Sequence, residues 1–309
     1  ASMSSGIARL FALLTIAALA HTPALSADPA CHVGFYRLAA GGGVDISPRD
    51  DGTLRWRRPD GTSGELTRGA DKSWSSTLGW TGRPDGKTVT FDVCAAGTMS
   101  FDGRSGRRAE FTTRDVKFRA GDVELAGRLV MPTGNAKVPI VVLVHGSEDL
   151  SARRFYADQR LFPSQGVGAF VYDKRGTGDS AGVFTHDYRR LATDAVAALD
   201  EARRLAGRRA GRIGFYGTSQ GGWVAPLAAT QTSVDVVVVG YGLAVSPLDE
   251  DTEAVELDMK RHGFGAAETA KALEVARAAQ ASVLSNFRDG FSELRALRAR
   301  DADEPWFKS

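Results

Sequence analysis

From residue 111 onward, apolar runs of strand length alternate with stretches of helical spacing. The extended runs are 111–118, 123–131, 138–144, 167–172, 213–216 and 234–239. Residues 191–205 place apolar side chains along one side of a helix, and a second helix is expected over 222–229. Strands that alternate with helices in this way predict an α/β fold, in which helices cover both faces of a parallel sheet.

Residues 27–111 follow a different pattern, in which short alternating stretches are separated by turn signals. Four Asp-Gly pairs divide this region: Asp51-Gly52, Asp60-Gly61, Asp85-Gly86 and Asp102-Gly103. The stretches between them, such as 53–57 and 88–93, alternate polar and apolar residues. Alternation around Asp-Gly turns predicts antiparallel hairpins, and therefore a small β-rich domain over 27–111. We identify no catalytic motif in it.

The first 26 residues have the pattern of a signal peptide. Arg9 precedes an apolar run over 10–20, which His21 interrupts, and Ala24-Leu25-Ser26 offers a small-x-small cleavage pattern. The run is too short to span a bilayer comfortably. We expect export, with a mature chain that starts near Ala27, is secreted or periplasmic and contains no further membrane segment. A retained amphipathic anchor and a tag-derived leader are the alternatives.

Composition and charge narrow the function classes only slightly. The chain has 309 residues, of which 43% are hydrophobic and 25% charged, and its net charge is +2. These values are typical of a globular protein of about two domains and give no strong nucleic-acid footprint. The basic clusters Arg55–Arg58 and Arg203–Arg212 are short, and we interpret them as solvated faces or turns.

The two cysteines, Cys31 and Cys94, lie between the signal peptide and the α/β region. Because an exported protein meets an oxidising compartment, a disulfide between them is plausible, and two separate buried thiols are the alternative. Two cysteines without a histidine-rich or Cys-x-x-Cys pattern do not predict a zinc site.

The motif with the clearest chemistry is Gly217-Thr218-Ser219-Gln220-Gly221, which follows a predicted strand and precedes a predicted helix. A sharp turn in this position exposes the serine at the top of the sheet, and its glycines avoid Cβ clashes. The N-terminus of the following helix favours developing negative charge. Ser219 is therefore the candidate nucleophile.

A second motif, His145-Gly146-Ser147, directly follows the apolar run 138–144. Acyl transfer requires two N–H donors aimed at the oxyanion, one from the residue after the nucleophile and one from the loop after an early strand. We assign these donors to Gln220 and Ser147. His145 suits shaping this loop better than acting as the general base.

A third motif, Asp173-Lys174-Arg175-Gly176-Thr177-Gly178-Asp179-Ser180, completes a recognisable set. Together the three motifs resemble the α/β-hydrolase superfamily, most closely bacterial secreted serine esterases and peptidase-like members with an added N-terminal domain. The resemblance covers about residues 112–245. It implies that the Arg-Gly-x-Gly segment is a structural loop, so that neither Asp173 nor Asp179 is the triad acid.

Two further histidines have simpler interpretations. Asp187, next to His186, is expected to begin the helix that follows it. His262 is expected near a helix end, with Gly263 as the terminating residue.

Residues 249–300 are helical in pattern throughout. We expect them to form a helical cap over the active site, in preference to additional covering of the sheet.

The expected reaction is hydrolysis of carboxylic esters through an acyl-enzyme on Ser219, without metal or organic cofactor. Small esters are the expected substrates, and short peptides are the alternative. A non-catalytic binding protein that retains the fold is an alternative from another class. We expect no nucleic-acid partner.

The sequence does not offer a triad acid and a catalytic histidine in the positions that this fold requires. In this fold the acid and the histidine follow the nucleophile on later strands. After Ser219 the sequence offers one clear strand, 234–239, and one histidine, His262. We therefore expect the hydrolase domain, 112–309, to be C-terminally incomplete, with little or no esterase activity and an exposed apolar sheet edge. The alternative is that His262 folds back onto Ser219.

Overall fold

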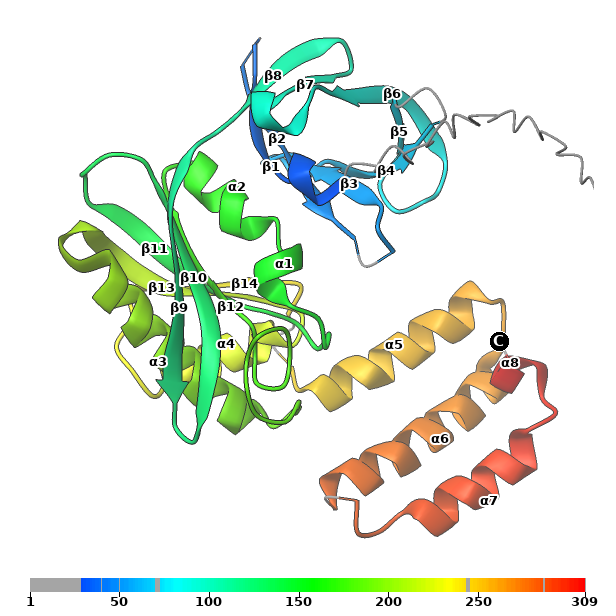
Figure 1. Ribbon diagram of the computed structural model, residues 1–309. Coiled ribbons are helices and arrows are strands. Elements are labelled where there is room, and N and C mark those ends of the chain that lie inside the picture. The colour runs from blue at the N-terminus through cyan, green and yellow to red at the C-terminus, as the bar shows by residue number, and fades with distance from the viewer. Residues whose placement is uncertain are drawn as a thin grey trace, which may run out of the picture.

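The structure is a computed structural model that describes residues 29–39, 41–49, 51–69, 73–242, 245–285 and 287–308. A β-barrel comes first, then a mixed sheet with helices, and then a run of helices (Figure 1). The predicted signal peptide lies outside the described residues. Within the described ranges, no helix is both long and apolar enough to cross a membrane.

The N-terminal β-rich region forms a closed antiparallel barrel, because its first strand also pairs with its eighth. Alternation directs side chains inward and outward, so that on β3 Leu54 and Trp56 are buried while Arg55 and Arg57 face out. Both Asp102 and Gly103 have positive φ angles, as a two-residue hairpin turn requires. The strands are β1 (Gly34–Leu38), β2 (Gly43–Pro48), β3 (Leu54–Arg57), β4 (Ser63–Arg68), β5 (Trp74–Thr77), β6 (Pro84–Phe91), β7 (Thr98–Phe101) and β8 (Arg104–Arg108).

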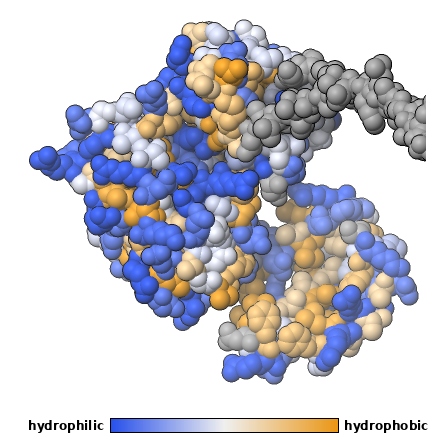
Figure 2. All heavy atoms as spheres, in the orientation of Figure 1, coloured by the Kyte–Doolittle hydropathy of each residue, from blue (hydrophilic) through white to orange (hydrophobic). Residues whose placement is uncertain are grey.

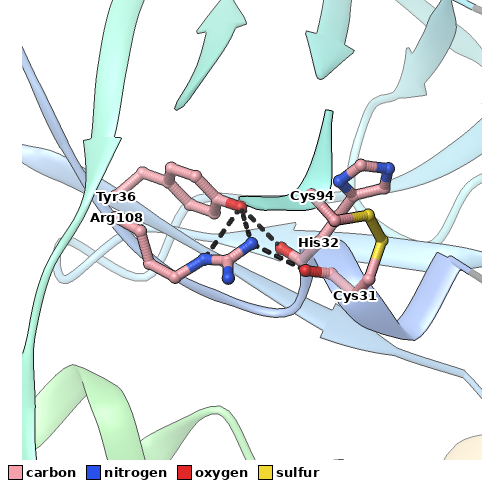
Figure 3. Close-up of a disulfide and its surroundings, with 5 residues drawn as sticks. All are labelled: Cys31, His32, Tyr36, Cys94 and Arg108. Atoms are coloured by element: carbon pink, nitrogen blue, oxygen red, sulfur yellow. Dashed lines mark hydrogen bonds between the residues drawn. A yellow bond between two sulfur atoms is a disulfide. The ribbon is translucent and has the colours of Figure 1, made fainter. Parts of the chain in front are cut away.

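A disulfide between Cys31 and Cys94 joins two short 3-10 helices, η1 (Pro29–His32) and η2 (Cys94–Ala96), with 5.7 Å between the two Cα atoms. Figure 3 shows Arg108 beside it, donating to the Cys31 carbonyl at 2.7 Å and to the Tyr36 hydroxyl at 2.9 Å. Tyr36 in turn donates to the His32 carbonyl. The disulfide interpretation of the two cysteines is confirmed.

The α/β region contains a six-stranded sheet in the order β14-β13-β11-β12-β10-β9. The four strands β11 to β14 are parallel as predicted, but β10 is antiparallel to both of its neighbours, so the sheet is mixed and the prediction of a parallel sheet was wrong for β9 and β10. All six strands lie where the apolar runs predicted them. They are β9 (Phe111–Ala120), β10 (Val123–Pro132), β11 (Val138–Val144), β12 (Gly168–Tyr172), β13 (Ala210–Thr218) and β14 (Val236–Gly240).

Helices cover both faces of this sheet. On one face α3 (Tyr188–Ala206) and α4 (Gly221–Ala229) bury apolar side chains in the main core, as the helical spacing predicted. On the other face lie α1 (Ala152–Phe155) and α2 (Asp158–Ser164), beneath the barrel (Figure 1). The sequence analysis did not predict these two short helices.

The barrel is attached to α2 by a buried ion pair. The Arg160 guanidinium donates to both carboxylate oxygens of Asp45, at 2.6 and 3.0 Å, and to the Ser47 hydroxyl. Asp45 is fully buried, and burial raises its pKa while Arg160 opposes that shift. The contact fixes the barrel above the sheet.

The helices expected over 249–300 are present as α5 (Pro247–Arg261), α6 (Ala266–Leu284) and α7 (Phe291–Asp301), followed by α8 (Pro305–Lys308). They extend away from the sheet (Figure 1), and in Figure 2 their visible face combines a hydrophobic stretch with hydrophilic residues around it. In the described residues no strand follows β14. Its side chains Val236, Val238 and Val239 are each more than 40% exposed, which matches the expected apolar edge.

Candidate active site

The candidate site lies where the sheet reverses its strand order. From β11 the chain crosses to β12 on one side, and later returns to β13 on the other. Ligands of open α/β sheets bind in the crevice outside the carboxyl ends of the strands at such a point. Here those ends carry His145-Gly146-Ser147 after β11 and Ser219 after β13. A Cβ placed on Gly146 would lie 3.3 Å from the Ser219 Cβ, so the two motifs are in contact.

The turn that holds Ser219 is as sharp as its glycines suggested. Ser219 has a φ of 51°, a conformation that non-glycine residues rarely adopt. A Cβ on Gly217 would lie 2.0 Å from the Gly221 carbonyl oxygen, and one on Gly221 equally close to that of Val144. Only glycine fits at these two positions, because the strand and the helix approach each other so closely.

Two backbone N–H groups, one in the loop after β11 and one at the elbow after β13, have no acceptor among the described residues. Within the described part of the chain, the N–H groups of Ser147 and Gln220 make no hydrogen bond. The N–H of Gly146 is occupied, because it donates to the Tyr156 hydroxyl at 3.2 Å. Ser147 and Gln220 thus present the free donors that the oxyanion assignment requires.

His145 and Lys174 hold the loop after β11. The His145 Nε2 accepts from the Lys174 N–H, and the Lys174 Nζ donates to the Gly146 carbonyl at 2.7 Å. Burial lowers the pKa of His145 and also lowers that of Lys174, to about 8. His145 is therefore a neutral, buried part of the loop, in agreement with our rejection of it as the base.

Glu148 is a site residue that the sequence analysis missed. Its carboxylate accepts a hydrogen bond from Tyr156, whose hydroxyl also holds the Gly146 N–H. Burial raises the pKa of Glu148, but the neighbouring His145 and Tyr156 side chains lower it by more than burial raises it. The resulting pKa is about 2. Burial and the Glu148 charge raise the pKa of Tyr156. An ionised carboxylate thus stands beside Ser219.

The Asp-x-Arg-Gly-x-Gly segment is structural, as the resemblance implied. Asp173 is buried and accepts from the Ser151 hydroxyl at 2.8 Å and from the backbone N–H of Arg153 and Asp179. Asp179 pairs with Arg153 at 2.9 Å. Both acids are thereby committed to loop contacts.

In the part of the chain that the structure describes, no histidine hydrogen-bonds the Ser219 side chain. His186 Nδ1 lies 2.8 Å from the Gln220 amide, and Asp187 caps α3 as predicted. His262 contacts its own helix turn at the Asp258 carbonyl, and Gly263 follows with a positive φ. The structure thus does not bring His262 to Ser219, and the base stays unassigned.

Ser219 opens onto a cavity of about 640 Å³ between the barrel and the sheet. Its sheet-side lining includes Gly146, Glu148, Tyr156 and Tyr241, and none of its lining residues belongs to α5–α8. The barrel contributes the opposite wall, with Trp80 and three arginines: Arg55, Arg57 and Arg58. Our interpretation of Arg55–Arg58 as a solvated face or turn therefore holds for Arg58, which begins the turn after β3, but it did not anticipate that this face forms a cavity wall. The alternation along β3 predicts that Arg55 and Arg57 share a face, but it gives no information on which part of the protein that face contacts.

Among the described residues, the only group that brings together ligand atoms suited to a metal is Cys31, His32 and Cys94. Two of these three sulfur or nitrogen donors are used by the disulfide. The group also lies in the barrel and does not line the cavity at Ser219.

Several solved structures are similar to this chain. A dienelactone hydrolase of Anabaena variabilis is 22% identical, with a TM-score of 0.34, over 42% of this chain and 63% of that one. A Pyrococcus furiosus esterase is 20% identical, with a TM-score of 0.41, over 48% and 57%. The acylaminoacyl peptidase of Pyrococcus horikoshii is 19% identical, with a TM-score of 0.34, over 64% and 36%.

The chain thus spans less than two thirds of the length of each of these structures. No curated protein matches it. The family described as X-Pro dipeptidyl-peptidase (S15 family) matches residues 121–308, which is more than half of the chain. The sheet order, the elbow at Ser219 and this match agree, and the chain belongs to the S15 family of α/β-hydrolases.

Proposed function

We propose that this chain hydrolyses carboxylic esters through an acyl-enzyme on Ser219. The observation that carries the proposal is the elbow itself. Ser219 has a left-handed backbone, lines the cavity, and stands beside the free N–H groups of Ser147 and Gln220. A candidate nucleophile, two candidate oxyanion donors and room for a substrate in one place support this proposal.

In the proposed reaction the Ser219 Oγ attacks the ester carbonyl carbon, and its proton passes through solvent water to the alkoxide that departs when the ester C–O bond breaks. The oxyanion formed by the attack accepts hydrogen bonds from the N–H groups of Ser147 and Gln220, and the alcohol leaves. Water then releases the acid from the acyl-enzyme. Because no described histidine is bonded to Ser219, esters with good leaving groups should react best, and water should attack the acyl-enzyme slowly.

Hydrolysis of short peptides is the second candidate, and the family description favours it. Amide cleavage also requires a proton for the leaving nitrogen, which a histidine supplies in serine hydrolases. With no such histidine at Ser219 among the described residues, we place esters first.

The test is a stopped-flow measurement with p-nitrophenyl acetate. We expect a burst of p-nitrophenolate equal to the protein concentration, followed by slow release, because acylation precedes a slower hydrolysis. Ser219→Ala should show no burst, and Ser105→Ala, which removes an exposed barrel hydroxyl, should retain it. Gly-Pro-p-nitroanilide, measured in parallel, reports on the peptidase candidate.

The same linear release from the unaltered chain and from Ser219→Ala would overturn the acyl-enzyme proposal. It would favour the non-catalytic binding protein as the alternative function.

We also propose that the protein is exported. The sequence of residues 1–26 suggests export, and the Cys31–Cys94 disulfide supports an oxidising compartment.

A further inference from the structure

The cavity at Ser219 has two walls of opposite charge. On the sheet side the ionised Glu148 lies close to Ser219, and Asp158 lies on α2. On the barrel side stand Arg55, Arg57 and Arg58, from β3 and the turn that follows it. The positive groups are therefore gathered opposite the reacting serine.

These arginines differ in how far the protein already satisfies them. Arg55 donates to the Phe155 carbonyl at 2.9 Å and lies over the Trp80 ring. Burial lowers the pKa of Arg55, and the positive charge of Arg57 lowers it further. Arg57 is 3.9 Å from the Asp158 carboxylate, a long distance for an ion pair. Arg55 thus has one firm acceptor, although its Nε is also buried without a hydrogen bond, whereas Arg57 is only loosely paired.

Arg58 has no side-chain acceptor among the described residues. Its guanidinium lies over the rings of Trp56 and Phe101, at 5.9 and 5.1 Å from their centroids, and its Nε is buried without a hydrogen bond. The nearby Asp60 carboxylate accepts from the Thr62 N–H and hydroxyl instead. A guanidinium held over aromatic rings, with its donors unused, is suited to a carboxylate ligand.

We propose that the barrel wall selects anionic substrates, with Arg58 and Arg57 binding a carboxylate carried at the end remote from the scissile ester. The ionised Glu148 beside Ser219 disfavours the reverse orientation, because it would repel that carboxylate. The exposed Trp80 ring, held under the guanidinium groups of Arg49 and Arg55, lines the same cavity and offers an apolar surface to the rest of the substrate. The substrate class is thus esters with a carboxylate at the far end. This inference rests on the proposed esterase function.

The test compares two esters that differ in charge, mono-p-nitrophenyl adipate and its methyl ester. We expect kcat/KM to favour the anionic ester, and this preference to fall by about tenfold or more in Arg58→Gln, since a charge-assisted hydrogen bond is lost. Arg57→Gln should reduce the preference as well, and added salt should weaken it in the unaltered chain. Arg37→Gln, which alters an exposed barrel arginine outside the cavity, should leave both rates unchanged.

A preference that is unchanged in both Arg58→Gln and Arg57→Gln would overturn the inference while leaving the esterase proposal intact. Thermal unfolding of each variant identifies loss of the fold, since Arg58 also covers aromatic rings of the barrel. If neither ester reacts, the esterase proposal fails instead. In that case, calorimetric titration with monomethyl adipate tests the carboxylate site on its own. Binding that is weaker in Arg58→Gln than in the unaltered chain would support the site, and an absence of binding would overturn it.

Discussion

At the scale of single residues, the Tyr156 hydroxyl joins the Glu148 carboxylate to the Gly146 N–H, next to Ser219. Ser219 could be predicted because glycines at 217 and 221 flank it between a strand and a helix, and the positive φ of Ser219 is consistent with that prediction. Glu148 and Tyr156 could not, because neither belongs to a periodic pattern or a motif. Their roles depend on a hydrogen bond that only the folded loop creates.

The depressed pKa of Glu148 makes a prediction about stability. Its folded value of about 2 lies below the ordinary 4.5, so its contribution is present above pH 4.5 and is lost as the pH falls toward 2. Allowing for its partial exposure, Glu148→Gln should lower the free energy of unfolding at neutral pH by about 1–2 kcal/mol. Urea unfolding at several pH values measures this difference, which should shrink as the pH falls below about 4.5.

Glu110→Gln is the matched control, because Glu110 is exposed. It should change the free energy of unfolding by less than about 0.5 kcal/mol at every pH. A Glu148→Gln difference that is independent of pH would contradict the electrostatic account of this carboxylate.

At the scale of elements, the long strands and helices could be predicted because they bury regular faces. The six sheet strands and α3 follow apolar runs or helical spacing. The helices α1 and α2 span only four and seven residues, too few to establish a period. The hairpins of the barrel could be read from their turns, but its closure pairs β1 with β8, and no local signal encodes that contact.

The approach of β13 to α4 predicts that the elbow tolerates no side chain at Gly217. Gly217→Ala would place a Cβ 2.0 Å from a backbone oxygen, and should cost about 3 kcal/mol or more. Gly240→Ala, at the neighbouring end of β14, meets atoms no nearer than 3.5 Å and should cost far less. Denaturant unfolding compares the two variants, and equal stability would contradict the packing described for the elbow.

At the scale of the whole molecule, the placement of the barrel determines what faces Ser219. Arg160 on α2 binds the buried Asp45, a partner 115 residues away in the chain, and this contact helps to hold the arginines of β3 at the cavity. Sequence patterns within each domain carry no information about that contact. The cavity wall therefore could not be predicted, although the two domains could.

The Arg160–Asp45 pair makes a prediction about domain attachment. Arg160→Ala leaves a fully buried carboxylate without its cation, and should destabilise the protein by about 3–5 kcal/mol. Arg189→Ala, an exposed arginine on α3, should cost less than about 0.5 kcal/mol. Calorimetric unfolding tests this difference. If both variants match the unaltered chain, the ion pair does not hold the barrel in place.

The central claim, that Ser219 is the nucleophile of this hydrolase, is tested most directly by covalent labelling. A fluorophosphonate probe reacts with activated serines, and mass spectrometry of the digested protein identifies the modified residue. We predict an adduct on the peptide that contains Ser219 in the unaltered chain and in Ser105→Ala, and none in Ser219→Ala. A folded chain that remains unlabelled, or a label that persists in Ser219→Ala, would contradict the account.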